Sequence, residues 1–162
     1  MTLLNAPGYD EKRENLHRNL LIGSAALVVL AVVLGLAGYI LGHGWFFTNF
    51  RAEHRVNQCF DAIQAKNFNE AYAIWMNDPN WQQHPSKYDY SLSRFTEDWT
   101  TASPVNGPIV NHHVDISKTD GTGAFGTGII VAVRVNGDHK LFMWYQKSDG
   151  TLTYPAPHVL DY

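Results

Sequence analysis

The chain has little cysteine and no concentration of positive charge. Its 162 residues contain one cysteine, which excludes an internal disulfide. The 12 Lys and Arg residues are outnumbered by 15 Asp and Glu residues, and no run of basic residues occurs. Because proteins bind nucleic acid by neutralising phosphates with clustered cations, nucleic acid is not an expected partner.

The sequence also lacks the patterns of common catalytic and metal centres. No G-x-S-x-G motif occurs, and Cys59 falls on the apolar side of an expected helix. The 8 histidines show no H-x-x-x-H spacing, and His112 and His113 are neighbours that point to opposite faces of a strand. Residues 121–126 fit G-x-G-x-x-G, but no helix is expected after them to bind a phosphate, so we interpret them as a loop. We therefore expect no catalytic residue, no metal and no cofactor.

The most informative feature that is present is a run of 23 residues without charge, from Leu20 to Gly42. As a helix it extends about 34 Å, against a hydrocarbon core of about 30 Å. Its 13 Leu, Ile and Val residues supply roughly −4 to −8 kcal/mol of insertion free energy. A cleaved signal peptide has a shorter apolar core and a small-x-small cleavage site, and no Ala-x-Ala follows this run. The sequence therefore predicts an uncleaved transmembrane helix at 20–42, after a polar tail at 1–19.

The flanks of the run predict how it sits in the membrane. Aromatic rings favour the boundary between lipid tails and headgroups. Four of them end or follow the run: Tyr39, Trp45, Phe46 and Phe47. We interpret residues 43–49 as an interfacial linker. Three basic residues precede the run (Lys12, Arg13, Arg18) and two follow at a greater distance (Arg51, Arg55). This bias favours an N-terminus inside, hence a single-pass inner-membrane protein with a periplasmic or extracellular C-terminal domain.

Small residues within the run form a stripe. They recur at helical spacing, with Val28 filling one gap: Ser24, Ala31, Gly35, Gly38 and Gly42. Residues 38–42 are also a literal G-x-x-x-G. Helices associate in lipid largely by close backbone packing, which small residues permit. The stripe predicts contact with another transmembrane helix, from a second copy or a different subunit. The alternative is that small residues are simply common in such helices.

The remaining residues, 50–162, suit one α+β domain. Apolar periodicity predicts three helices, at 50–65, 68–76 and 87–101. Alternation and turn signals then predict three or four strands, at 109–117, 128–135, 141–147 and 151–154, with a tight turn at Asn136-Gly137. In the first strand the alternation places Val110, His112, Val114 and Ile116 on one face. We expect the helices to pack on a curved antiparallel sheet. Both faces of the expected sheet are apolar. Either the sheet is covered on both sides, or it curves around a cavity, or the face away from the helices is partly used as an interface.

The domain resembles the cone-shaped α+β superfamily named for nuclear transport factor 2. The resemblance rests on FDAIQAKNFNEAYAIW at 60–75 and GTGIIVAVRVNGDHKLFMWYQKSDGTL at 126–152. It implies a pocket between sheet and helices. Some members are isomerases or cyclases, and others are non-catalytic scaffolds, including a single-span component of type IV secretion; similar anchored proteins occur among bacterial sequences. The isomerase members pair an Asp base with a hydrogen-bond donor, usually a Tyr or a protonated Asp. Asp115 with Tyr72, Tyr88 or Tyr145 has this chemistry here, but none of them matches a motif position of the family.

Aromatic residues are the remaining candidates for a binding site. Five of them are interpreted as possible pocket or partner contacts: Tyr72, Trp75, Trp81, Trp99 and Trp144. Aromatics at helical spacing usually belong to the core, whereas Trp81 lies in an expected loop. We expect a non-catalytic accessory, assembly or scaffold subunit whose outer domain binds a protein partner. The alternative is a pocket protein, either an isomerase-type enzyme or a binder of an apolar small molecule.

Overall fold

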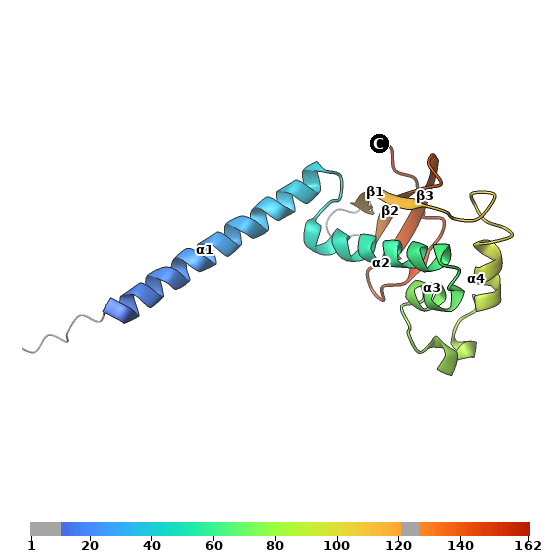
Figure 1. The fold of residues 1–162 in the computed structure, drawn as a ribbon, viewed down its shortest axis with the longest axis horizontal. Helices are drawn as coiled ribbons and strands as arrows, with labels where there is room; N and C mark the ends of the chain where they lie inside the picture. Colours follow the sequence, from blue (N-terminus) through green and yellow to red (C-terminus); the bar gives the residue numbers. More distant parts are fainter. Residues whose placement is uncertain (1–10, 121–126) are drawn as a thin grey trace, which may run out of the picture.

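The computed structural model describes residues 11–120 and 127–162, except the side chain of Phe46. Most of the polar tail and the loop at 121–126 lie outside the described residues. The first helix, α1 (Glu11–Ile40), projects from the domain (Figure 1). It is long and apolar enough to cross a membrane, and 6% of its most apolar stretch is buried. It starts before the expected span, because the charged turns at 11–18 continue the helix, with Glu11 and Glu14 in the first turn.

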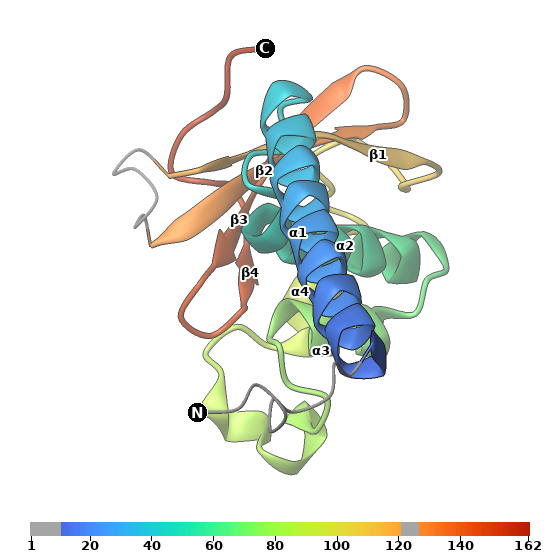
Figure 2. The same ribbon diagram turned by 90° about the vertical axis from the view of Figure 1, so that its left-hand side faces the viewer.

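The rest of the chain is α+β, as expected. The helices α2 (Phe46–Gln64), α3 (Phe68–Trp75) and α4 (Leu92–Asp98) precede the strands β1 (His112–Thr119), β2 (Gly128–Val135), β3 (His139–Gln146) and β4 (Leu152–Thr153). The strands form one antiparallel sheet in the order β1-β2-β3-β4. Helix α2 lies against β1 and β2, and α3 contacts both α2 and α4. In Figure 2, α1 points toward the viewer and lies in front of these helices.

Two helices differ from their expected bounds. Helix α2 begins at Phe46, so the second half of the expected linker 43–49 is its first turn. The third domain helix is much shorter than 87–101. The chain before it forms two 3₁₀ turns, η2 (Trp81–Gln83) and η3 (Pro85–Lys87), and α4 starts only where Ser91 caps it by accepting from the Arg94 amide. A Ser side chain at this position satisfies a free amide and so fixes the helix start.

Strand β1 contains a bulge that the alternation did not predict. The pairing with β2 shifts between Val114 and Ile116, so Asp115 is an extra residue. Val114 and Ser117 therefore both face the helices, and Ile116 faces the other side. The expected placement of Val110 and Ile116 with Val114 is wrong. Val110 precedes the strand and is 62% exposed.

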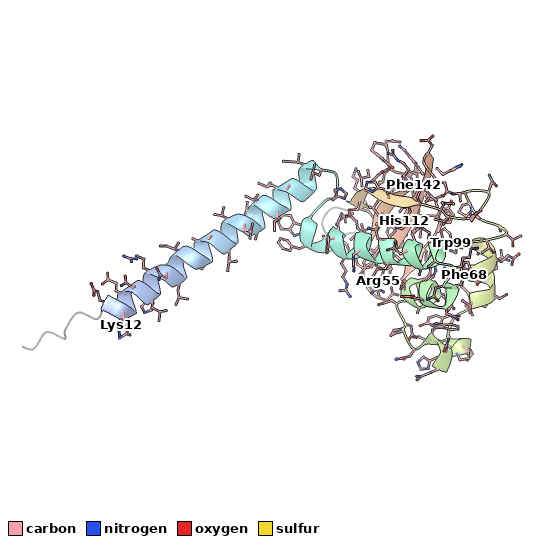
Figure 3. All side chains as sticks on the ribbon, in the orientation of Figure 1. Lys12, Arg55, Phe68, Trp99, His112 and Phe142 are labelled. Atoms are coloured by element: carbon pink, nitrogen blue, oxygen red, sulfur yellow. The ribbon has the colours of Figure 1, made fainter. Side chains whose placement is uncertain are left out.

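The two sheet faces are covered differently. Alternate residues of β2 and β3 join the helices in the main core, among them Ile129, Val131, Val133, Leu141 and Met143. On the opposite face, Ile130 and Ala132 are also buried, and Phe142 lies on this side, away from α2 (Figure 3). The chain after β4 crosses this face, with contacts from Ala156 N to Phe142 O, His158 to Asp120 and Tyr162 to Asp115. The sheet face away from the helices is therefore covered by the C-terminal segment of the same chain.

Candidate functional site

The junction between α1 and α2 is an elbow built on glycine. The chain leaves α1 through Gly42 and Gly44, whose φ angles are +83° and +60°. Residues with a Cβ rarely adopt such angles. The turn brings Trp45 back onto α1, where a Cβ built on Gly35 would lie 2.5 Å from the Trp45 ring. Trp45 therefore packs here because position 35 has no side chain.

A polar cluster fixes this elbow to the sheet. Asn49 is fully buried, and its Nδ2 donates to the carbonyl oxygen of Ser117 at 3.3 Å and to its Oγ at 3.0 Å. Ser117 in turn donates from Oγ to the carbonyl of His43 at 3.1 Å and from its amide to Gly42 at 3.0 Å. His43 and Glu53 pair at 2.8 Å. These contacts join the end of α1, the start of α2 and β1 into one unit.

The Asn49 contacts predict a measurable loss of stability. We expect Asn49→Ala to lower the free energy of unfolding of the domain by about 1–3 kcal/mol, because buried polar groups of Ser117 lose their partner. Thermal unfolding of the full chain in detergent measures this. Gln58→Ala, which removes an exposed amide from the same helix, is the control. An equal effect of the two substitutions would contradict the role of the cluster.

Exposed apolar residues surround the elbow. We call this set the collar; its members are between 51% and 79% exposed and are Tyr39, Ile40, Leu41, Trp45, Phe47 and Phe50. Two of the rings predicted for the membrane boundary, Tyr39 and Trp45, thus lie on either side of the turn, with Phe47 on the first turn of α2. Phe50 was not predicted, although it follows Phe47 by three residues and shares its helix face.

The predicted stripe on α1 divides into two parts. Gly35 and Gly38 are buried, and Gly42 lies beyond the helix, where a Cβ would meet the Ile116 side chain at 2.8 Å. The chain itself therefore occupies the glycine end of the stripe. Ser24 is exposed and Ala31 is half-buried, so this part remains accessible to another helix. Contact with a second transmembrane helix stays a prediction, and the residues predicted to make it are now Ser24 and Ala31.

The domain contains a pocket of about 620 Å³. Helix α4, which contributes Asp98 to its lining, lies at the end of the domain away from α1 (Figure 1). Two of the five predicted aromatic residues, Trp75 and Trp99, line it; Trp99 is labelled in Figure 3. Tyr72 lies behind this wall, with its hydroxyl donating to Tyr90 O at 2.5 Å, and Trp81 packs edge-on against Tyr72. Trp144 lies on the far face of the sheet, where it stacks over Gly128.

The other aromatic residues of the pocket are not among the five predicted contacts. Tyr88 and Tyr90 come from the irregular segment before α4, and Tyr154 follows β4. Tyr88 and Tyr90 fall within the helix expected at 87–101 and Tyr154 at the end of the strand expected at 151–154, but the structure has irregular chain at all three positions. Asp98, at the end of α4, also lines the pocket. The one available signal was the density of tyrosines at 88–90.

Hydrogen bonds fix the state of the pocket's polar groups. The Tyr90 hydroxyl donates to Asp98 Oδ2 at 2.9 Å, and Arg94 Nε lies 3.2 Å from Oδ1. Burial, followed by the contact with Asp98, raises the pKa of Tyr90 well above its ordinary value. Tyr90 is therefore a neutral donor at physiological pH; one Asp98 oxygen accepts from it, and the other lies beside the Arg94 guanidinium.

The remaining candidates from the sequence are metal ligands, the Cys59 thiol and the Asp115 carboxylate. No group of three or more His, Cys, Asp or Glu residues within 11–120 and 127–162 is placed to hold a metal ion. The Cys59 thiol is fully buried, and burial raises its pKa far above the ordinary value, so it is a core group. For Asp115, burial raises the pKa, but hydrogen bonds from Tyr162 and Arg134 outweigh burial and hold it below its usual range. Asp115 is thus an ion-pair partner on the outer sheet face.

Comparison with known proteins adds no assignment to these observations. No family model, curated protein or solved structure matches this chain.

Proposed function

We propose that this chain is a single-pass membrane protein that acts without catalysis, as an accessory, assembly or scaffold subunit whose extracytoplasmic domain binds a protein partner. The observation that carries the proposal is the elbow. It fixes an apolar helix, exposed on nearly all sides, to a folded domain through buried hydrogen bonds. A partner that contacts α1 therefore meets the domain in a defined orientation.

The collar supports the placement in the membrane. The start of α2 lies beside the end of α1, where Phe50 and Leu41 line the same groove. Aromatic side chains are stabilised at the boundary of the bilayer. The collar then rests at the membrane surface and holds the domain beside it. The excess of basic residues before the span favours an inner-membrane protein with the domain outside.

The accessible part of the stripe is the proposed contact with a partner helix. We expect the double variant Ser24→Leu, Ala31→Leu to weaken the assembly of the protein about tenfold, because the leucine side chains keep the two helix backbones from approaching closely. Gel filtration and crosslinking in mild detergent measure the assembly. Substituting Gly35 or Gly42 is a poorer test, since either side chain meets this chain's own residues.

The control is Ala26→Leu, which enlarges an exposed residue on the opposite side of α1. It should leave assembly unchanged. If the double variant assembles as the wild type does, no partner helix packs on Ser24 and Ala31.

The pocket favours a second candidate function, the binding of a small molecule. Its volume and aromatic walls are those of a ligand site. The Tyr90–Asp98 pair at its wall resembles the hydrogen-bond donor and carboxylate base of an isomerase. However, the Asp98 side chain is 34% exposed and pairs with Arg94, and such a carboxylate favours binding over proton abstraction from carbon.

A further inference from the structure

The walls of the pocket are unusually rich in aromatic rings. Five of its lining residues are aromatic: Trp75, Tyr88, Tyr90, Trp99 and Tyr154. Four of these rings form a chain of contacts, with centroids 6.4 Å apart for Trp75 and Tyr90, 5.7 Å for Trp75 and Trp99, and 5.8 Å for Trp99 and Tyr154. These residues come from α3, the segment before α4, the residue after α4 and the segment after β4. They are far apart in the sequence, and the fold brings their rings together at one pocket.

The charged residues of the lining are all acidic. Among the described residues, Asp98 and Asp149 line the pocket, and no Lys, Arg or His does. Asp149 accepts from the Thr151 amide at 3.0 Å and from its hydroxyl at 2.7 Å, which keeps its carboxylate ionised. Arg94 offsets part of the charge of Asp98, but its own side chain is 64% exposed and lies outside the lining.

One ring of this wall already holds an ammonium group. The Nζ of Lys87 lies 4.8 Å from the centroid of the Tyr88 ring, and it pairs with Asp78 at 3.4 Å. The Tyr88 hydroxyl donates to the same carboxylate at 2.7 Å. Aromatic faces combined with carboxylates favour cations, because ring quadrupoles and negative charges act in the same direction.

We infer that the pocket binds an organic cation, a molecule with an apolar body and a quaternary or protonated amine. The inference rests on the second candidate function and specifies the ligand class of that site. The volume of about 620 Å³ lies within the range of roughly 300–1,000 Å³ of sites for small organic molecules. Helix α4, which contributes Asp98 to the lining, lies at the end of the domain away from α1 (Figure 1), so we expect the ligand to enter from water and not from the bilayer.

A matched pair of probes isolates the charge. Choline and 3,3-dimethylbutan-1-ol have nearly the same shape, but the alcohol carries carbon in place of the charged nitrogen. We titrate the full chain in a non-ionic detergent with each probe and follow tryptophan fluorescence, to which Trp75 and Trp99 contribute from the pocket wall. We expect choline to bind about tenfold more tightly than the alcohol, as expected when a desolvated cation meets aromatic faces.

Variants locate the effect. Asp98→Asn should weaken choline binding about fivefold and leave binding of the alcohol unchanged. The neighbouring Glu97→Gln, which removes the same charge from an exposed position outside the lining, should change neither. Tyr154→Leu is a second variant, at a residue that is 38% exposed and so tolerant of change, and it should also weaken choline binding.

The possible failures are distinguishable. Equal binding of both probes overturns the cation inference and leaves a small-molecule site in place. Binding of neither probe overturns the inference and argues against the second candidate function as well. Choline binding that Asp98→Asn and Tyr154→Leu leave unchanged places the cation elsewhere and also overturns the inference. None of these results bears on the scaffold proposal, which depends on the elbow and α1.

Discussion

Replacing Val28 and Val32 with aspartate should remove the protein from the membrane. Both side chains lie near the middle of the apolar stretch of α1 and are 63% and 51% exposed. Each aspartate at a helix centre costs about 2.5–3.5 kcal/mol of insertion free energy, and each lost valine removes roughly a further 0.3–0.6 kcal/mol. The double variant therefore loses about 6–8 kcal/mol. The apolar residues of the span supply roughly −4 to −8 kcal/mol, so little or no net driving force remains.

The measurement is the fraction of protein that stays with membranes after alkaline extraction. We expect nearly all of the wild-type chain in the pellet and most of the double variant in the supernatant. Val28→Leu with Val32→Leu is the control, because it keeps the sites apolar and should behave as the wild type. The membrane-bound wild type should have the full mass of 18.3 kDa. A shorter product would identify residues 20–42 as a cleaved signal sequence, and the anchor proposal would be wrong.

The fold was predictable where a local pattern carries the information. The β-branched run at 128–135 and the Asn136-Gly137 pair predicted the β2–β3 hairpin, and both turn residues have positive φ, at 50° and 92°. Periodicity also indicated α3 closely, because its apolar face packs in the core. The bulge at Asp115 was not predictable in this way. It depends on Ser117 reaching Asn49, which is 68 residues away in sequence, and strand alternation carries no signal of such a contact.

The pocket and the elbow were predictable only where a local sequence pattern indicates the direction of a side chain. Trp75 and Trp99 lie on helices or directly after them, so their spacing indicated which side they face. Tyr90 and Tyr154 reach the pocket from irregular chain, where direction depends on the whole fold. At the elbow, the spacing of the glycines predicted only that α1 packs closely on another helix. Only the structure brings Trp45 against Gly35, because the partner of the glycine is ten residues further along the same chain.

Truncating Phe95 should have the largest effect on the folded domain. Phe95 is fully buried, and its ring centroid lies 5.4 Å from that of Trp75, 5.7 Å from Tyr72, 6.2 Å from Tyr90 and 6.3 Å from Trp99. We expect Phe95→Ala to lower the free energy of unfolding by about 3–5 kcal/mol, because removing a buried ring loses its transfer free energy and leaves a cavity. For a domain of this size, that is a fall in melting temperature of roughly 10–25 °C.

Thermal unfolding in detergent, followed by near-ultraviolet circular dichroism, measures the effect, since the signal comes from the aromatic cluster itself. Phe50→Ala is the matched control: it removes the same ring from the collar, where the side chain is 55% exposed, and should cost less than about 1 kcal/mol. Phe95→Leu should fall between the two. Because Trp75, Tyr90 and Trp99 line the pocket and rest on Phe95, the alanine variant should also lose the tryptophan response to choline. An alanine variant as stable as Phe50→Ala would mean that the aromatic cluster is not the core that positions the pocket wall.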